Sequence, residues 1–222
     1  MKSTLTNLFI RAKDIFQQEG LISLLRRGFT FLAGYLFRYE TYCFIEHTMK
    51  EVKNEDDFMS IIQGLTAKMV YTHQQADELV ADGFDFLDYW TDSRRRYLDK
   101  GAIAFCIFVG QELACIAWIA MTQEAKDELD PIPYHVDFSS GEACMAGALT
   151  LPKYRGKGLM TYNTAWRHRI LKEHGIITAR GSMRTNNIVA QNTWRKLGFK
   201  PYAKARKLKL GPWTFWKEIT LQ

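Results

Sequence analysis

The sequence predicts an α/β fold with a mixed, mostly antiparallel central sheet that helices cover on both faces, preceded by an N-terminal helical appendage. Three observations predict this fold. Strand and helix patterns alternate from residue 39 onward. The hairpin pattern at residues 102–121 is apolar on both faces, as expected of strands with helices on both sides. The chain has 222 residues, 47% of them hydrophobic, enough for one sizeable core.

The appendage comprises residues 1–38, and the domain comprises residues 39–222. Residues 5–18 place apolar side chains at helical spacing, and Gly20 is expected to end this helix. The apolar run 29–37 is far shorter than the roughly 20 residues of a membrane span. We expect the segment to pack on the domain or on a second subunit, as in a homodimer. Peripheral contact with a membrane is the alternative, because basic residues flank exposed Leu and Phe.

The first half of the domain is expected to contain strands, helices and a hairpin. Strands are expected at residues 39–47 and 65–72, and two helical stretches at 74–99, broken near Gly83. Residues 102–121 form the hairpin, and residues 131–138 form a proline-led loop. The hairpin reverses at Gly110 and Gln111, a two-residue turn. Counting back from this turn places Cys106 directly opposite Cys115.

The second half alternates again between strands and helices. The expected order is strand 141–151, helix 158–174, strand 175–183, helix 186–198 and a final hairpin of 200–210 with 213–221. A basic turn with two glycines joins the first strand to the first helix. Such a turn leaves backbone N–H groups without partners at the positive end of the helix dipole. This arrangement binds phosphate.

The charge is divided along the chain. Residues 1–38 carry 6 basic against 2 acidic residues, residues 39–152 carry 8 against 20, and residues 153–222 carry 16 against 2, so the net charges are +4, −12 and +14. This division predicts that one part binds an anion while another attracts a cation. The alternative is that the charged faces neutralise each other after folding.

Cysteine and histidine spacing indicates no metal site. The four cysteines show no C-x-x-C spacing, and no secretory signal precedes them. The five histidines form no pair at metal-ligand spacing. We therefore expect a reduced, cytoplasmic protein without a disulfide framework or a bound metal.

Two segments, YRGKGLM and NIVAQNTWRKLGF, resemble the GCN5-related N-acetyltransferase (GNAT) family. In that family a strand, an [RQ]-x-x-G-x-[GA] turn and a helix bind the pyrophosphate of acetyl-coenzyme A. Arg155 and Gly158 match the turn, whereas Met160 stands where the family has Gly or Ala. The resemblance is clear over residues 100–222 and rests on element order alone over 39–99.

The second segment matches the family pattern N-x-x-A-x-x-x-Y-x-x-x-G-F. The matching residues are Asn187, Ala190, Gly198 and Phe199. Trp194 replaces the usual Tyr. An amphipathic surface helix with Trp194 in its core stripe is compatible with this reading.

The resemblance implies acetyl-coenzyme A as co-substrate. Backbone N–H groups of residues 156–160 would hold the pyrophosphate, and Arg155 and Lys157 would add positive charge. Met160 is tolerated if its side chain points toward the core. The expected cofactor contacts are Leu149, Thr150, Leu151, Arg155, Gly156, Lys157, Gly158, Leu159, Met160, Asn187, Ala190 and Trp194.

The attacking amine must be neutral, so a carboxylate or a water chain should take its proton. Glu142 is the first candidate for this base, followed by Asp137 and His135. Because Trp194 has no acidic proton of suitable pKa, Tyr202, Tyr162 or water would protonate the departing thiolate, if a donor is needed.

The sequence thus predicts an N-acetyltransferase that transfers acetyl from acetyl-coenzyme A to a primary amine of a small molecule or protein, by direct attack in a ternary complex. A non-catalytic acyl-coenzyme A sensor is one alternative, favoured by Met160 and Trp194. A nucleic-acid-binding domain is another, favoured by the basic C-terminal third with its aromatic residues. The two motifs argue against it, so no nucleic-acid partner is expected. Aminoacyl transfer on the same fold usually needs two copies of the domain.

Overall fold

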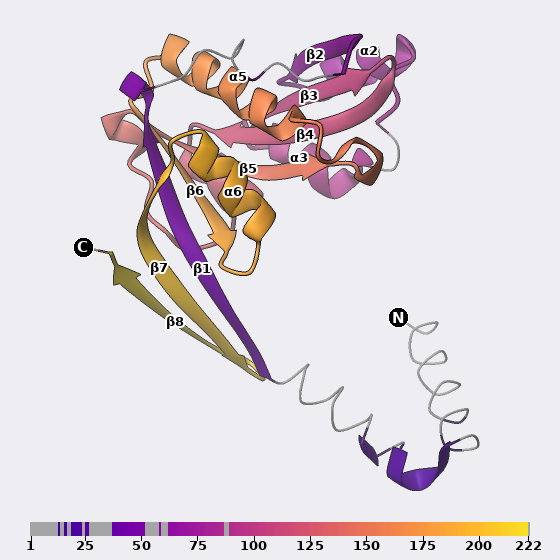
Figure 1. The fold of residues 1–222 in the computed structure, drawn as a ribbon, viewed down its shortest axis with the longest axis vertical. Helices are drawn as coiled ribbons and strands as arrows, with labels where there is room; N and C mark the ends of the chain where they lie inside the picture. The colour runs from indigo at the N-terminus through magenta and orange to yellow at the C-terminus, as the bar shows by residue number, and fades with distance from the viewer. Residues whose placement is uncertain are drawn as a thin grey trace. The chain divides into compact units, whose positions relative to one another are not determined.

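The computed structural model describes residues 13, 16, 19–23, 25–26, 37–51, 58, 62–86 and 89–221 (Figure 1). The chain divides into two compact units. The larger contains Tyr42–Lys204 and Ile219–Gln222, and the smaller contains Met1–Thr41 and Ala205–Glu218. The predicted helix at residues 5–18 lies almost entirely outside the described residues. The predicted division after residue 38 therefore stays a prediction.

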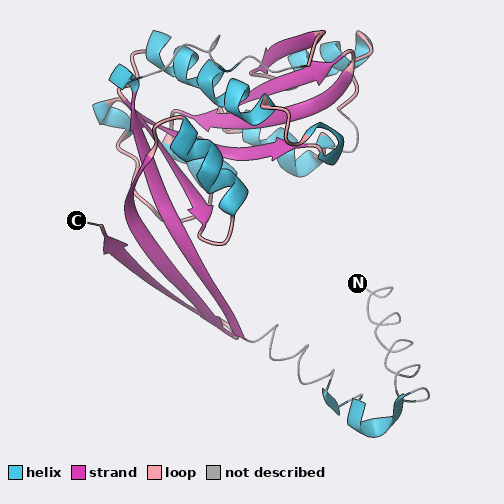
Figure 2. Cartoon of the chain, viewed as in Figure 1, coloured by secondary structure: helices cyan, strands magenta, loops and turns pink. Residues whose placement is uncertain are grey.

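Eight strands form one mixed sheet (Figure 2). They are β1 (Phe37–Thr48), β2 (Leu65–Val70), β3 (Ile103–Val109), β4 (Glu112–Ala120), β5 (Glu142–Thr150), β6 (Thr178–Arg184), β7 (Lys200–Leu210) and β8 (Trp213–Thr220), in the order β2-β3-β4-β5-β6-β1-β7-β8. The pair β5–β6 is parallel, whereas β2–β3, β3–β4, β4–β5 and β1–β6 are antiparallel. The predicted mixed, mostly antiparallel sheet is confirmed.

Helices lie on both faces of the sheet, as predicted. They are α2 (His73–Ala81), α3 (Asp92–Asp99), α4 (Gln123–Leu129), α5 (Leu159–Glu173) and α6 (Ile188–Lys196), with short 3-10 turns η1 (Met49–Glu51), η4 (Phe138–Ser140) and η5 (Pro152–Tyr154). Helix α5 connects the parallel strands β5 and β6 and packs on β3, β4 and β5. Helices α3 and α4 pack against the same three strands, and α3 is drawn behind them in Figure 1.

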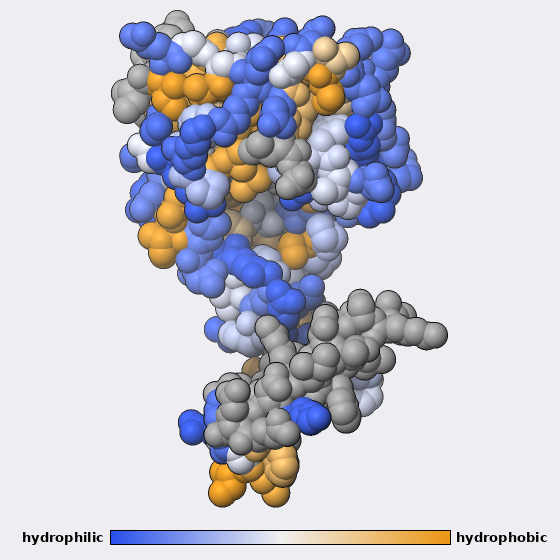
Figure 3. Space-filling view, turned by 90° about the vertical axis from the view of Figure 1, so that its right-hand side faces the viewer, coloured by the Kyte–Doolittle hydropathy of each residue, from blue (hydrophilic) through white to orange (hydrophobic). Residues whose placement is uncertain are grey.

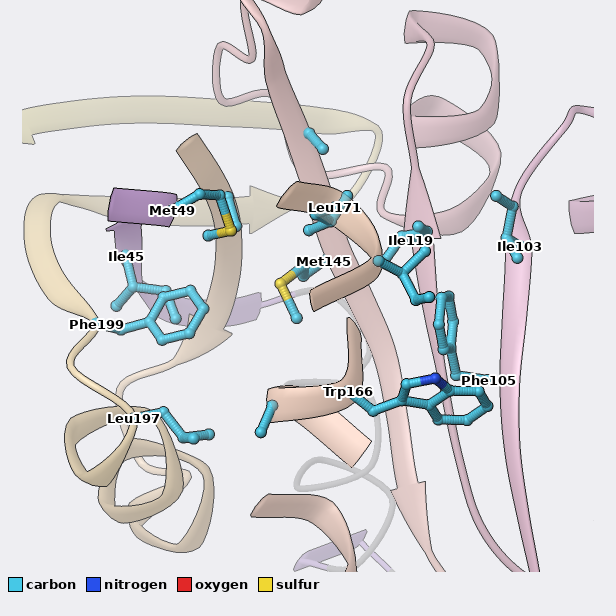
Figure 4. Packing of buried hydrophobic residues seen from close by; sticks show 14 of the residues in the cluster. Ile45, Met49, Ile103, Phe105, Ile119, Met145, Trp166, Leu171, Leu197 and Phe199 are labelled. Carbon is cyan, nitrogen blue, oxygen red and sulfur yellow. The ribbon is translucent and has the colours of Figure 1, made fainter. Parts of the chain in front are cut away.

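Strand alternation separates the two faces of the sheet. Ala143 and Met145 of β5 point toward α5 and α6 and join a buried apolar cluster. In this cluster Phe105 of β3 meets Trp166 of α5 edge to face, with 4.8 Å between ring centroids (Figure 4). Trp118 of β4 faces the other way, where its indole N–H donates to the Tyr89 hydroxyl at 3.1 Å.

The predicted hairpin is present, but the predicted cysteine pair is wrong. Val109 lies opposite Glu112, as the turn at Gly110 and Gln111 requires. A register shift then places Ile107 opposite Cys115 and Cys106 opposite Ile116. Ala114 is the extra residue of a β-bulge, which moves every later pair by one position. Cys106 and Cys115 consequently point to opposite faces of the sheet.

Several large apolar side chains of the N-terminal segment are exposed to solvent. They are Phe16, Leu21, Ile22 and Leu25. On the face of the larger unit shown in Figure 3, hydrophilic residues are interspersed with apolar areas, as is usual for a folded protein. None of the helices that the structure describes has the length and hydropathy needed to cross a membrane. The expected packing of residues 1–38 on a domain, a second subunit or a membrane stays a prediction.

Candidate functional site

Strands β5 and β6 separate along their length and form a V. They pair only where Glu142, Ala143 and Cys144 face Thr178, Ala179 and Arg180. Beyond these pairs, β5 is registered only with β4, and β6 only with β1, within the described residues. Gly147 and Ala148 are exposed although β5 is an interior strand of the sheet. The V therefore leaves backbone polar groups in the middle of the sheet free for another partner.

The part of β5 after Cys144 and the part of β6 after Arg180 do not pair with each other and are the open arms of the V. A β-bulge lies on the open arm of β5. Trp118 of β4 faces Ala146 and Ile116 faces Leu149, so Gly147 and Ala148 together lie opposite one residue of β4. Gly147 has a φ of 62°, and a Cβ atom there would lie 2.7 Å from Trp118 Cδ1. Only glycine fits both the backbone and the space. The bulge disrupts the β4–β5 ladder locally and leaves a residue unpaired at the V.

The open arm of β5 leads directly into the glycine turn. Gly156 and Gly158 have φ values of 76° and 81°, and a Cβ atom at either position would meet nothing within 4 Å. The first hydrogen bond of α5 runs from the Tyr162 N–H to the Gly158 carbonyl at 3.0 Å. Backbone N–H groups of residues 159–161 thus have no intrahelical partner. Open space and N–H donors together fit a bound pyrophosphate.

The side chains of the turn divide between solvent and core. Arg155 is exposed, and its Nε donates to the Thr150 carbonyl at 3.1 Å. The ammonium of Lys157 lies 5.6 Å from the centroid of the Tyr154 ring. Met160 packs against the buried cluster that contains Leu159. The Met160 side chain therefore points into the protein. This is the orientation in which a residue larger than Gly or Ala was expected to be tolerated at this position.

The second motif forms the start of α6. Asn187 is the N-cap, and its Oδ1 accepts the N–H of Ala190 at 3.1 Å. Trp194 stands edge to face with Phe199, with 4.3 Å between centroids, and packs against the core. Trp194 also approaches Gly181 of β6, where an added Cβ atom would be 3.7 Å from its ring and 2.9 Å from the Met145 carbonyl. Trp194 thus packs where β5 and β6 lie close together.

The predicted cofactor contacts consequently fall into two groups. Leu149 and Thr150 end β5, and Leu151 follows them in the stretch that leads through residues 155–160 into α5. Asn187 caps α6, and Ala190 and Trp194 lie on this helix, which packs against α5. Their contacts with a cofactor stay predictions.

Glu142 and Tyr202, the predicted catalytic residues, both contact Arg180 on β6. The Glu142 carboxylate lies 2.7 Å from the Arg180 guanidinium and accepts the Asp137 N–H at 2.7 Å through its other oxygen. The guanidinium also lies 4.6 Å from the centroid of the Tyr202 ring. Glu142 stands at the closed end of the V, where β5 and β6 are paired.

Asp137 caps η4. Its carboxylate accepts the backbone N–H and the hydroxyl of both Ser139 and Ser140. Hydrogen bonds from Ser139 and Ser140 lower the Asp137 pKa to about 2. A carboxylate this weakly basic is poorly matched to proton abstraction near neutral pH. His135, the other alternative base, is exposed on the same loop.

Sequence reasoning did not identify a buried polar cluster on the face opposite α5 and α6. Asp130, at the end of α4, accepts the Ser182 hydroxyl at 2.7 Å. The Tyr134 hydroxyl lies 3.2 Å from the Cys144 sulfur. Burial raises the pKa of Tyr134 well above 10, and Cys144 and Asp130 raise it further. No motif connects these residues in the sequence, because Asp130 follows α4, Tyr134 lies in a loop, Cys144 lies on β5 and Ser182 lies on β6.

The buried cysteines are poor nucleophiles. Burial raises the pKa of Cys144 and of Cys115 to about 12, so both are protonated near neutral pH. Across the described parts of the chain, no three His, Cys, Asp or Glu side chains are grouped to hold a metal ion.

No family model matches the sequence, and no curated protein is similar enough to match it. Solved structures do match. A GCN5-related glucosamine N-acetyltransferase region of a fungal multi-domain GH3 β-N-acetylglucosaminidase superposes with a TM-score of 0.56 at 12% identity, over 89% of this chain and 23% of that one. A GNAT-family acetyltransferase from Colwellia psychrerythraea gives 0.52 at 14% identity, over 78% and 57%. A tandem GNAT protein from the clavulanic acid biosynthesis pathway gives 0.52 at 14%, over 89% and 59%.

The chain has the GNAT fold. The V, the bulge and the glycine turn therefore lie in the acyl-coenzyme A N-acyltransferase architecture that the sequence predicted. Identities of 12–14% establish the fold alone. The chain spans 23–59% of the length of these three structures, so the activities of those proteins are not transferred to it.

Proposed function

We propose that the protein is an acyl-coenzyme A-dependent N-acyltransferase that transfers acetyl from acetyl-coenzyme A to a primary amine. The observation that carries this proposal is the V between β5 and β6, whose open arm leads through an exposed bulge at Gly147 into the glycine turn. One continuous stretch of backbone thus offers hydrogen bonds to a long acyl-thioester arm and to the pyrophosphate at its end.

The chemistry follows from this arrangement. A backbone N–H at the bulge would stabilise the oxyanion that forms when the amine attacks the thioester carbonyl. Direct attack fits better than an acyl-enzyme intermediate, because Cys115 and Cys144 are buried and protonated. Positive charge at Arg155 and Lys157 would bind the phosphates.

A thiol-release assay with acetyl-coenzyme A and a panel of amines tests the proposal. We expect thiol release that depends on the amine, together with one acetylated product for each thiol. Coenzyme A binding without thiol release from any amine would favour the sensor alternative. Absence of coenzyme A binding would contradict both.

Replacing Arg155 by Ala should weaken coenzyme A binding. A charge-assisted hydrogen bond contributes about 1.5–3 kcal/mol, so the Kd should rise roughly 10- to 100-fold, while the KM for the amine changes little. Titration calorimetry measures the Kd. Arg169→Ala is the matched control, because Arg169 is exposed on α5 and pairs with Glu173 at 3.1 Å. Equal coenzyme A affinities for Arg155→Ala and the parent would show that Arg155 does not bind the phosphates.

A Glu142→Gln variant distinguishes a role of Glu142 as base from a structural role in its ion pair with Arg180. Glu142→Gln removes the charge that faces Arg180 at 2.7 Å. If Glu142 is the base, turnover falls, coenzyme A binding is kept, and activity returns in part at higher pH. If Glu142 only pairs with Arg180, turnover is kept and thermal stability falls.

A further inference from the structure

Asp130 carries a buried carboxylate that forms no ion pair with any residue the structure describes. The residue is 7% exposed. Its Oδ2 accepts the Ser182 hydroxyl at 2.7 Å, and its Oδ1 accepts the Ile132 N–H at 3.3 Å. No Lys, Arg or His nitrogen of the described residues lies within 4.0 Å of it. Buried charges in proteins are normally paired, because removing an ion from water without a partner is costly.

Two cations on the elements next to Asp130, Lys126 of α4 and Arg180 of β6, have other partners. Lys126, one turn earlier on α4, directs its ammonium to the Ile132 carbonyl at 2.5 Å, the Asp127 carboxylate at 3.5 Å and the face of Tyr134. Arg180 on β6 is occupied by Glu142. A negative charge at the C-terminal end of α4 also opposes the helix dipole, so helix stability does not explain an acidic residue there.

Asp130 lies at the open end of the V. Leu129, the preceding residue, reaches the bulge, where its Cδ1 would be 3.1 Å from a Cβ atom on Gly147. Ser182 lies on β6, two residues beyond Arg180, the last residue of β6 that pairs with β5. The carboxylate therefore contacts the open arm of β6, and the residue before it contacts the bulge of β5, on the face opposite α5 and α6.

We propose that Asp130 binds the acceptor: its carboxylate holds the ammonium of an aliphatic primary amine and takes a proton from it beside the bulge. This inference rests on the proposed function and names its substrate class. The ammonium supplies the cation that the buried carboxylate lacks. Asp130 thereby takes the role of base that the sequence assigned to Glu142, whose carboxylate is instead paired with the Arg180 guanidinium at 2.7 Å.

The proton and bond changes balance without another reactant. Asp130 takes one proton from the ammonium and passes it to solvent. The neutral nitrogen attacks the thioester carbon, the C–N bond forms, and the C–S bond breaks. The second proton lost by nitrogen goes to the departing thiolate, leaving the amide and free coenzyme A.

The test compares two classes of amine with the full-length chain. An alkylamine is a cation near neutral pH, whereas aniline is neutral there. For Asp130→Asn, kcat/KM with the alkylamine should fall roughly 10²- to 10⁴-fold, the range of general-base catalysis, and should fall far less with aniline. Coenzyme A affinity should stay at the parent value. Glu128→Gln is the control, because Glu128 lies on the same helix and pairs at the surface with Arg96 at 3.2 Å.

Ser182→Ala provides a second variant that keeps the carboxylate and removes only its hydroxyl partner. It should lower kcat/KM for the alkylamine more than for aniline, and less than Asp130→Asn does. Equal losses for both amines, or no loss, would overturn the assignment of Asp130. A parent protein that binds coenzyme A but releases no thiol with any amine would instead contradict the proposed function.

Discussion

Gly158→Val is expected to weaken coenzyme A binding by about 10²-fold or more. Gly158 is the N-cap of α5, with a φ of 81°, and space around its Cα is open. A branched side chain there would occupy the space in front of the N–H groups that begin α5. Losing two charge-assisted hydrogen bonds of about 1.5–3 kcal/mol each accounts for a change of this size. Titration calorimetry with coenzyme A measures it.

Gly175→Val is the control that separates two effects of Gly158→Val: blocking of the ligand and strain in the backbone. Gly175 follows α5 at its other end, has a φ of 74°, and is also open around its Cα. Both substitutions force a branched residue to a positive φ, at about 1–2 kcal/mol each. Thermal unfolding should therefore show similar losses for the two variants. Weaker coenzyme A binding by Gly175→Val as well would show that the loss comes from strain and not from the turn.

Elements with a strong local pattern were predictable from the sequence. Strands β3 and β4 are long, apolar and joined by a two-residue turn, so both their existence and their burial follow from residues 102–121. Helix α5 has an apolar face and a glycine turn before it. For such segments, the apolar periodicity and the turn residues favour the same local structure that the tertiary contacts stabilise.

Two misses have local physical causes. Helix α4 is only seven residues long, and its N-cap, Thr122, accepts the Ala125 N–H at 3.2 Å. So short an amphipathic pattern is weak evidence for a helix. The displaced cysteine register comes from the single extra residue Ala114. Nothing in an unbroken apolar strand marks the position of such a bulge.

The candidate site was predictable where it is continuous in sequence. The turn at residues 155–160 and the open arm of β5 are adjacent in the chain, and a helix N-terminus after glycines has a direct chemical meaning. The V itself depends on where β5 and β6 stop pairing, which is set by contacts far apart in sequence. The same holds for Asp130 and Ser182, which are 52 residues apart.

The stability of the protein is expected to fall as the pH falls below about 6.5, because of His168. His168 on α5 stacks on His47 of β1, with 4.8 Å between ring centroids, and both residues are buried. Burial lowers the pKa of His168 well below 6.5, and His47 and Arg167 lower it further. The Nε2 of His168 has no hydrogen-bond partner among the described residues.

The sign follows from proton counting. Between the lowered pKa of the folded protein and 6.5, the unfolded chain binds a proton at His168 that the folded protein does not. The contribution of neutral His168 to the free energy of unfolding is therefore complete above pH 6.5. Below that pH it is lost at up to ~1.4 kcal/mol per pH unit. Urea unfolding at a series of pH values measures this slope. His168→Leu should reduce this slope by the equivalent of about one bound proton. His135→Gln, on an exposed loop, should leave the slope unchanged. An unchanged acid slope in His168→Leu would show that other groups cause the loss, and that the ring stack contributes packing alone.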